Sequence, residues 1–415
     1  MMLRRISTGE ISASRREVLD AKTCAEAAAI VEDVKTRGEE ALIDHGRRLG
    51  DWRDGEPVVL DRNDLEAGFA QVSDCDRELL ERAANRIRSF ASAQRRAISD
   101  MSIAVSGGRA GHTIEPVERA ACYAPGGLFP LPSSVLMTAL TARAAGVREV
   151  WVASPRPAPI TIAAAFVAGA DALLTIGGVQ AIAAFAYGAG QVPACDAIVG
   201  PGNRWVAAAK QCVAGRVTID MLAGPSELVV LADASADPAL IAADLLAQAE
   251  HDEDALPVLV ALDGKLVVAV ERELERQLAT LPTAETARKA LANGFALVET
   301  DLRRAIQACD DIAPGHLQIS LRDPHVAAYL VRHCGAVFVG AKSAKVLGDY
   351  GAGPNHVLPT SRGARSHAGL SVLTFLRVRT WLEMEDPSEL AVDAAAFARL
   401  EGLEAHARAA ERRGV

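Results

Sequence analysis

The pattern of apolar and polar positions divides this chain into a helical first part and a longer part with a different period. From Glu17 to about Ser99, apolar residues recur at three-to-four spacing with charged residues between them, which predicts helices. From Ala104 onward, short apolar runs alternate with helical segments. This alternation predicts parallel strands joined by right-handed helical crossovers.

The alternating part contains two series of similar layout. In the first, strands are predicted at 119–124, 149–154, 172–176 and 197–199, and helices at 133–145, 160–168 and 179–188. In the second, strands are predicted at 228–232, 257–262, 296–298, 317–320 and 336–339, and helices at 238–249, 265–278, 302–309 and 324–333. Ser133 is expected to cap the first helix. The fold class is therefore α/β, with two Rossmann-like doubly wound domains.

The chain has 415 residues, which is more than one typical hydrophobic core organises. The predicted division is a helical N-terminal arm at 1–103, a first Rossmann-like domain at 104–227, a second at 228–345 and a C-terminal extension at 346–415. After Gly340 the chain is rich in Gly and Pro, and a charged helix is expected from about Ser388. The extension is too small to fold alone, so we expect it to pack on something else.

Composition narrows the class of protein. A net charge of −9 argues against a nucleic-acid or anionic membrane partner, which would need basic patches. No apolar run approaches the length of a membrane span, and the first residues lack the apolar core of a signal peptide. We therefore expect a cytoplasmic protein. The 7 cysteines are scattered without a Cys-x-x-Cys pair, so they are expected to be reduced and mostly buried.

Candidate chemistry is concentrated between residues 177 and 252. The loops Gly200-Pro201-Gly202-Asn203 and Ala223–Glu227 each follow an apolar strand, and their glycines let backbone amides approach a ligand closely. Gln248 and His251 lie three apart on an apolar helix, so they share one face. Gln is an uncommon zinc ligand, and this spacing alone does not predict a metal site.

Taken together and in this order, the segments GGVQAIAAFAYGAG, VGPGNRWVAAAKQ, IDMLAGPSELVVLAD and LLAQAEHD resemble the histidinol dehydrogenase family. The resemblance covers residues 17 to 410 and implies a zinc-dependent, NAD-dependent oxidation of an amino alcohol, L-histidinol or a close analogue. It also implies four metal ligands, Gln248, His251, Asp349 and His406. Such a mixed set of nitrogen and oxygen ligands suits a zinc ion with open positions.

The resemblance assigns further roles residue by residue. His316, in the segment APGHL, matches the catalytic histidine, and a neutral imidazole suits proton removal near pH 7. The residues matched to substrate contacts are Ser226, Gln248, His251, His316, Asp349, His356, Glu401 and His406. The residues matched to NAD contacts are Tyr123, Gln180 and Asn203, although no G-x-G-x-x-G fingerprint follows a strand. From the residues alone, His316 would also suit a buried strand edge, and Glu401 a solvated helix face.

One residue departs from the family pattern. Family members carry Glu before the catalytic histidine, where this chain has Gly315, and that Glu is the general base of the second oxidation, from aldehyde to carboxylate. Either Asp310, Asp311 or another carboxylate compensates, or the second oxidation is weak. The alternatives are thus a four-electron histidinol dehydrogenase, a two-electron alcohol dehydrogenase on another substrate, and an inactive zinc-binding homologue. The resemblance further implies a homodimer, in which Glu401 and His406 complete the partner's site.

Overall fold

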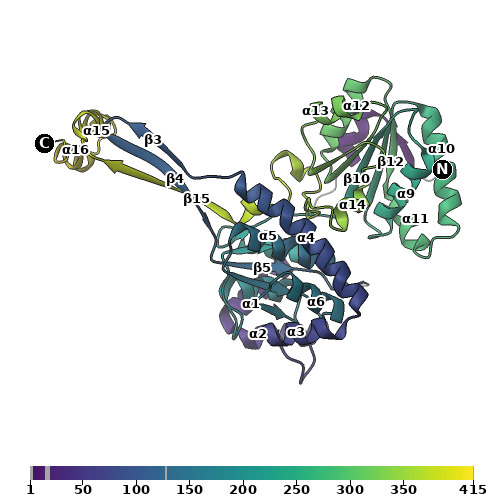
Figure 1. Ribbon diagram of the computed structural model, residues 1–415, viewed down its shortest axis with the longest axis horizontal. Coiled ribbons are helices and arrows are strands. Elements are labelled where there is room, and N and C mark those ends of the chain that lie inside the picture. Colours follow the sequence, from purple (N-terminus) through teal and green to yellow (C-terminus); the bar gives the residue numbers. More distant parts are fainter. Residues whose placement is uncertain (1–2, 15–18, 127–128, 415) are drawn as a thin grey trace.

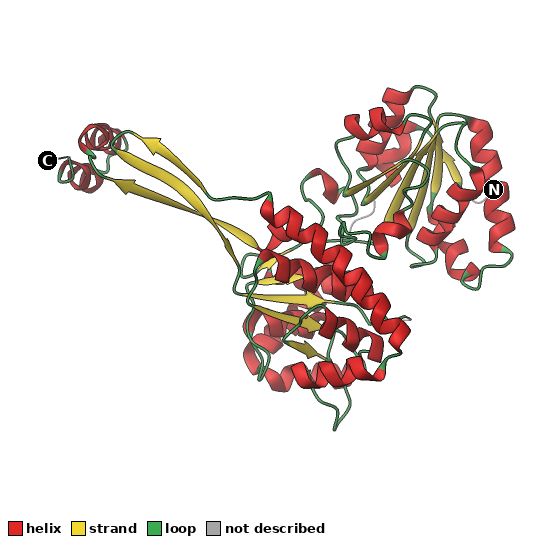
Figure 2. Cartoon of the chain, viewed as in Figure 1, coloured by secondary structure: helices red, strands yellow, loops and turns green. Residues whose placement is uncertain are grey.

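The computed structural model describes residues 3–14, 19–126 and 129–414, and within them the chain forms two α/β units and a projecting arm (Figure 1). The predicted helix start at Glu17 and the turn residue Gly127 lie outside the described residues. Both units contain a sheet of mostly parallel strands with helices on its two faces (Figure 2). The predicted α/β fold with doubly wound sheets is confirmed.

The sheet of the first unit has the strand order β2-β7-β6-β5-β8-β9. Its strands are β2 (Val59–Leu60), β5 (Arg119–Tyr123), β6 (Glu149–Ala153), β7 (Ala172–Leu174), β8 (Ala197–Val199) and β9 (Thr218–Ile219). Strand β2 is antiparallel to β7, and the other pairs are parallel. The order reverses between β5 and β8, which is where open α/β sheets form a crevice at their carboxyl edge.

The sheet of the second unit is parallel throughout, with the order β1-β12-β11-β10-β13-β14. Its strands are β1 (Arg4–Ile6), β10 (Glu227–Ala232), β11 (Leu256–Ala261), β12 (Phe295–Val298), β13 (His316–Ser320) and β14 (Ala336–Val339). The central strands are buried on both faces, so they form continuous apolar runs rather than alternating ones.

Helices cover each sheet on both sides and form separate apolar cores. In the first unit, one face carries α1 (Ala21–Arg37), α2 (Glu39–Leu49), α7 (Gly178–Tyr187) and α8 (Arg204–Val213), and the other carries α3 (Arg62–Gln71), α4 (Asp74–Arg96), α5 (Pro132–Ala145) and α6 (Pro159–Val167). In the second, one face carries α9 (Pro238–Ala249), α10 (Gly264–Leu278) and α11 (Ala284–Asn293), and the other η1 (Thr8–Ser14), α12 (Leu302–Ile312) and α13 (Pro324–Leu330). Short helices follow at α14 (Lys345–Asp349), η2 (Gly363–Arg365) and η3 (Val372–Phe375).

The arm is an antiparallel sheet that extends away from the first unit (Figure 1). It consists of β3 (Met101–Val105), β4 (Gly108–Pro116) and β15 (Leu376–Met384), with α15 (Ser388–Leu400) and α16 (Glu404–Glu411) at its tip. The C-terminal extension thus pairs with β4, which lies in the sequence between α4 and β5 of the first unit. The arm was not predicted as a sheet. Its first strand, β3, runs across the domain boundary expected between residues 103 and 104.

The first 103 residues do not form one separate arm. Strand β1 pairs with β12 in the second unit, whereas α1 to α4 pack on the first unit. Ser133 does not cap α5, because Leu131 occupies the N-cap and Pro132 the first helical position, where its fixed φ is favourable. The 7 cysteines, all within the described residues, are free thiols. None of the helices in the described part of the chain is long and apolar enough to cross a membrane.

Candidate functional site

The residues matched to the cofactor lie at the end of β5, in the first turn of α7 and immediately before α8. Gly200 follows β8 with a φ of +119°, and a Cβ there would lie 2.0 Å from the carbonyl oxygen of Tyr123 at the end of β5. Only glycine therefore allows the two strand ends to approach this closely. Asn203 caps α8, because its side-chain oxygen accepts hydrogen bonds from the backbone N–H groups of Trp205 and Val206.

Tyr123 and Gln180 lie together at the start of α7. The backbone N–H of Gly178 donates to the Tyr123 hydroxyl at 3.1 Å, and Gln180 Nε2 donates to Asp51 Oδ2 at 3.2 Å. Gln180 is fully buried, and its Oε1 has no hydrogen-bond partner. A buried acceptor without a partner in the first turn of α7 suits a ligand that offers a hydroxyl or N–H donor, such as the ribose or amide groups of a dinucleotide. The residues present thus fit a dinucleotide.

His316 is the first residue of β13 and is 5% exposed. Its Nδ1 lies 2.8 Å from the carbonyl oxygen of Glu227 at the start of β10. Because a carbonyl only accepts, Nδ1 carries the proton and Nε2 keeps a free lone pair. Nε2 is buried without a hydrogen-bond partner, and Phe338 stacks on the ring at 6.2 Å. His316 is therefore a fixed imidazole whose basic nitrogen is available to a ligand.

Burial also determines the charge of this imidazole. Desolvation, followed by the nearby Lys345 ammonium, lowers the pKa of His316 to about 3. The ring is neutral near pH 7, which is the form that can accept a proton.

Gln248 and His251 lie at the end of α9. Gln248 is fully buried, its Oε1 lies 3.4 Å from Ser226 Oγ, and its Nε2 has no hydrogen-bond partner. His251 follows the helix end, and desolvation of its ring lowers its pKa. Gln248 is thus a buried amide with one side-chain atom that has no protein partner, and His251 lies just beyond the end of the same helix.

Asp349 lies at the end of α14 and contacts Lys345 of the same helix as well as His316 and His356. Its Oδ2 accepts from Lys345 Nζ at 2.7 Å, its Oδ1 lies 3.8 Å from His316 Nε2, and its backbone carbonyl accepts from His356 Nδ1 at 2.9 Å. Burial would raise the pKa of Asp349, but Lys345 and His316 outweigh it and lower the pKa below its usual range. Asp349 is thus a carboxylate with one oxygen open toward His316.

Glu401 and His406 lie elsewhere in this chain. Both are exposed and belong to the helical tip of the arm, away from the second unit (Figure 1). Among the described residues of a single chain, no group of three or more His, Cys, Asp or Glu side chains is arranged for a metal ion. The structure therefore brings together Gln248, Asp349, His316 and Ser226 but not the two C-terminal residues.

The donors that do lie together fit a divalent cation in part. Gln248 and His251 supply neutral donors, and Asp349 supplies one open carboxylate oxygen, which is a set of the kind zinc accepts. The discordant residue is Lys345, a second cation already bound to Asp349. A fourth ligand from outside the chain would complete the set.

One connection, between β9 and β10, joins the unit that contains Tyr123, Gln180 and Asn203 to the unit that contains His316. Strand β9 ends at Ile219 at the carboxyl edge of the first sheet, and β10 begins at Glu227 at the amino edge of the second. Within this connection, Gly224 N donates to Thr360 Oγ1 at 2.7 Å, and Ser361 N donates to Glu227 Oε1 at 2.9 Å. The candidate site thus lies where the carboxyl edge of the first sheet is joined to the amino edge of the second sheet.

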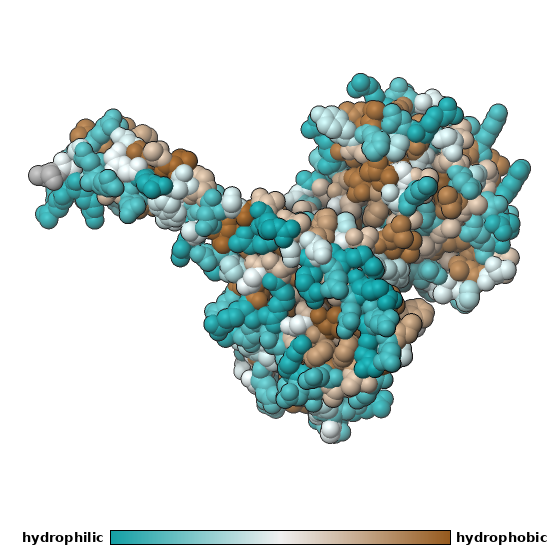
Figure 3. Space-filling view, viewed as in Figure 1, coloured by the Kyte–Doolittle hydropathy of each residue, from teal (hydrophilic) through white to brown (hydrophobic). Residues whose placement is uncertain are grey.

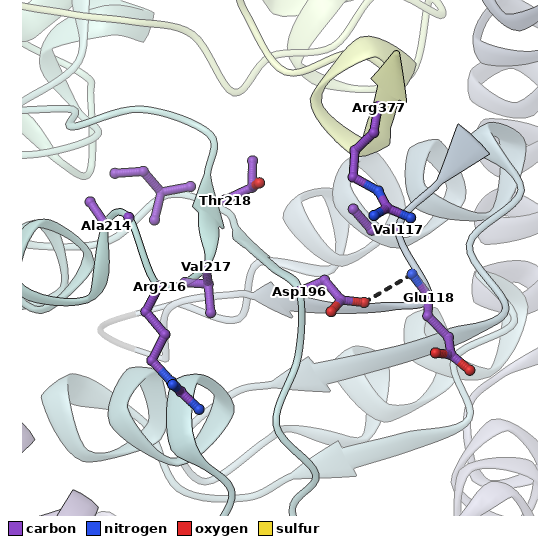
Figure 4. A pocket seen from close by; sticks show the side chains of 10 residues that line it. Val117, Glu118, Asp196, Ala214, Arg216, Val217, Thr218 and Arg377 are labelled. Atoms are coloured by element: carbon purple, nitrogen blue, oxygen red, sulfur yellow. Dashed lines mark hydrogen bonds between the residues drawn. The ribbon is translucent and has the colours of Figure 1, made fainter. Parts of the chain in front are cut away.

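A separate hollow lies at the opposite, amino edge of the first sheet (Figure 4). Its lining includes Glu118, Asp196, Arg216 and Arg377, and Asp196 Oδ2 accepts from the backbone N–H of Glu118 at 2.9 Å. It contains none of the residues matched to substrate, metal or cofactor. It is therefore distinct from the candidate site.

Sequence reasoning missed three residues of the candidate site. Asp51 contacts Gln180, Glu227 holds His316, and Lys345 contacts Asp349. Only Lys345 had a local signal, since it precedes Asp349 by four residues on one helix face. The other two contacts join segments far apart in the chain, which spacing does not reveal.

Comparisons with known proteins agree with the geometry. A family model described as histidinol dehydrogenase matches residues 13–414. Histidinol dehydrogenase of Thermus thermophilus is 46% identical over 388 residues, covering 92% of this chain and 93% of that protein. The enzyme of Pseudomonas putida is 42% identical over 393 residues, covering 92% and 89%.

A crystal structure of histidinol dehydrogenase from Elizabethkingia anophelis aligns with a TM-score of 0.93 and 30% identity, covering 99% of this chain and 98% of that chain. Fold and relatives together define the class of this protein, which is an oxidoreductase built from two doubly wound units. Within that class, the chain belongs to the histidinol dehydrogenase family.

Proposed function

We propose that this protein catalyses the NAD-linked oxidation of an amino alcohol, L-histidinol or a close analogue. The observation that carries the proposal is His316, whose Nδ1 is fixed by the Glu227 carbonyl and whose Nε2 is buried, neutral and unpartnered. The sequence similarity to histidinol dehydrogenases supports the substrate class.

The first oxidation needs one base and one hydride acceptor. His316 Nε2 takes the hydroxyl proton, the C–H bond of the carbinol carbon breaks, and its electron pair leaves as hydride, so an aldehyde forms. Tyr123, Gln180 and Asn203 would hold NAD, which supplies the hydride acceptor when bound. The stacking of Phe338 on His316 keeps the base in one orientation, and such positioning can remove much of the barrier.

Gln248, His251 and Asp349 would hold a divalent metal, together with His406 of the partner subunit. When bound, zinc would supply a positive charge that fixes the amine and imidazole of the substrate. The test is metal analysis of His251→Ala, which should lose both turnover and metal. An unchanged metal stoichiometry in that variant would defeat the assignment.

A homodimer is part of this proposal, because the arm exposes apolar side chains in the single chain (Figure 3). The most exposed of them on the arm are Ile103, Val378, Leu382, Val392, Phe397 and Leu400. Exposed apolar side chains gathered on one projecting element favour a protein interface there. A second copy of the chain would cover it and bring Glu401 of the partner subunit to the substrate ammonium.

Gly315 favours a second candidate, a single two-electron oxidation. The expected substitutes for the missing Glu are engaged elsewhere. Asp310 Oδ1 accepts from the backbone N–H groups of Arg332 and His333, and Asp311 accepts from Gln307. Glu227 Oε2 accepts from Gly315 N at 3.4 Å and its Oε1 accepts from Ser361 N at 2.9 Å, so this carboxylate is also engaged.

The deciding experiment counts NADH formed per molecule of substrate consumed, with L-histidinol and a panel of amino and sulfonated alcohols. A ratio near two supports the full oxidation to the carboxylate, and a ratio near one supports the single step. Absence of NADH with every alcohol would contradict the proposed activity.

A further inference from the structure

Lys345 is a buried cation among the donors proposed for the metal. It begins α14, is 5% exposed, and its Nζ donates to Asp349 Oδ2 at 2.7 Å. Its backbone N–H donates to Gln318 Oε1 at 3.3 Å, and Gln318 Nε2 in turn donates to Asp244. The lysine is thus held in place by its surroundings and does not reach the site from a mobile surface chain.

The charge of Lys345 acts on the whole donor set. Its Nζ lies 2.7 Å from Asp349 Oδ2, and the other oxygen of the same carboxylate lies 3.8 Å from His316 Nε2. A divalent ion bound to Asp349 would be repelled by the same ammonium group. Two cations that share one carboxylate repel each other, and burial strengthens the repulsion because little solvent screens it.

We infer that Lys345 competes with the divalent metal for Asp349 and thereby sets how tightly this enzyme binds its metal. The inference rests on the proposed metal-binding function of the site. The ammonium neutralises the one carboxylate among Gln248, His251 and Asp349, so the three donors together offer the metal no net negative charge. A lysine that only oriented Asp349 would have the opposite effect, because its loss would weaken metal binding. The two roles predict changes of opposite sign.

The test measures Zn²⁺ affinity of the full-length, metal-stripped protein by competition with a chromogenic chelator. Lys345→Gln removes the charge but keeps an N–H donor for Asp349 Oδ2. We expect it to bind Zn²⁺ at least about tenfold more tightly than the natural protein, since one nearby like charge is removed. Lys342→Gln makes the same charge change on an exposed residue three positions earlier and should leave the affinity unchanged.

Lys345→Met serves as the second variant, and thermal melting shows whether each variant is folded. Tighter binding by either folded variant, with no change in Lys342→Gln, supports competition. Unchanged or weaker binding in the folded variants overturns it, as does a gain of the same size in Lys342→Gln.

A parallel titration of His251→Ala separates this inference from the proposed metal site. If that variant loses Zn²⁺ binding while the charge of Lys345 has no effect, only the competition is wrong. If neither residue affects binding, the metal site itself is wrong, and the competition with it.

Discussion

A side chain at position 315 would point into a confined space formed by residues 358–360. A Cβ on Gly315 would lie 3.1 Å from the carbonyl oxygen of Pro359 and 3.5 Å from Thr360 Cγ2, so a small displacement of the 358–360 segment would accommodate it. The backbone there needs no positive φ, so glycine is not required by conformation. Its presence removes a carboxylate without being demanded by the fold.

Gly315→Glu should therefore raise the oxidation of a supplied amino aldehyde by about 10² or more, because a general base typically contributes 10²–10⁴ in rate. The measurement compares NADH formation from the aldehyde in both proteins, with Gly315→Gln as the control for added volume without a base. Fast aldehyde oxidation by the natural protein would show that another residue already acts as the base.

The buried His316 should make stability depend on pH in a defined direction. Its pKa is about 3 in the folded protein and near the ordinary value of about 6.5 in the unfolded chain, so the unfolded chain binds the proton first as pH falls. The free energy of unfolding of the metal-free protein should decrease from pH 7 to pH 5. Denaturant titrations at both pH values should show a smaller decrease for His316→Gln, and an equal decrease would contradict the assignment.

Only part of the candidate site could be predicted at the scale of residues. The resemblance supplied the residue types, and the structure places Ser226, Gln248, His316 and Asp349 at one junction. The sequence could not show that Lys345 contacts Asp349, because the burial of a lysine depends on tertiary packing. Nor could a single sequence place the helical tip of the arm relative to the second unit.

At the scale of elements, a buried ion pair holds the loop that carries Asn203. Lys210 on α8 and Asp220 after β9 lie 2.6 Å apart with side chains 4% and 0% exposed. Asp220 Oδ2 accepts from Gly200 N, and Lys210 Nζ donates to the Gly200 carbonyl. The pair thus fixes both polar groups of the glycine at the strand end.

Lys210→Met should lower the free energy of unfolding by about 3–5 kcal/mol, because it leaves a buried carboxylate without its partner. It should also raise KM for NAD more than it changes kcat, since the cofactor loop loses its support. Lys22→Met, at a lysine that is 85% exposed, is the matched control. The double variant Lys210→Met, Asp220→Asn should lose less of the free energy of unfolding than Lys210→Met alone. An equal loss in the two variants would argue against the ion pair.

Most elements of the two units could be predicted, because apolar runs and helical periods are set by burial against a sheet. Helix α9 and strand β14 match the predicted ranges. The arm strands could not be predicted, since in β15 most residues are exposed and apolar and polar positions do not alternate with burial. Helix α11 was also missed, because it buries only a few side chains.

At the scale of the molecule, two inactive variants should regain activity when they are combined in one dimer. If the arm of one chain completes the site of another, a heterodimer of His251→Ala and His406→Ala contains one site with both residues intact. Mixing the proteins under conditions of subunit exchange should recover part of the activity. Confirmed exchange with no activity would exclude a shared site.

The position of β1 has a consequence for the order in which this protein assembles. Residues 4–6 pair with 295–297, whereas α1 to α4, which follow β1 and η1 along the chain, belong to the first unit. During synthesis, the earliest segment to leave the ribosome must wait for nearly three hundred further residues before its neighbour exists. The first unit can condense meanwhile, so closure of the second sheet edge is a late, long-range step of the kind that slows folding.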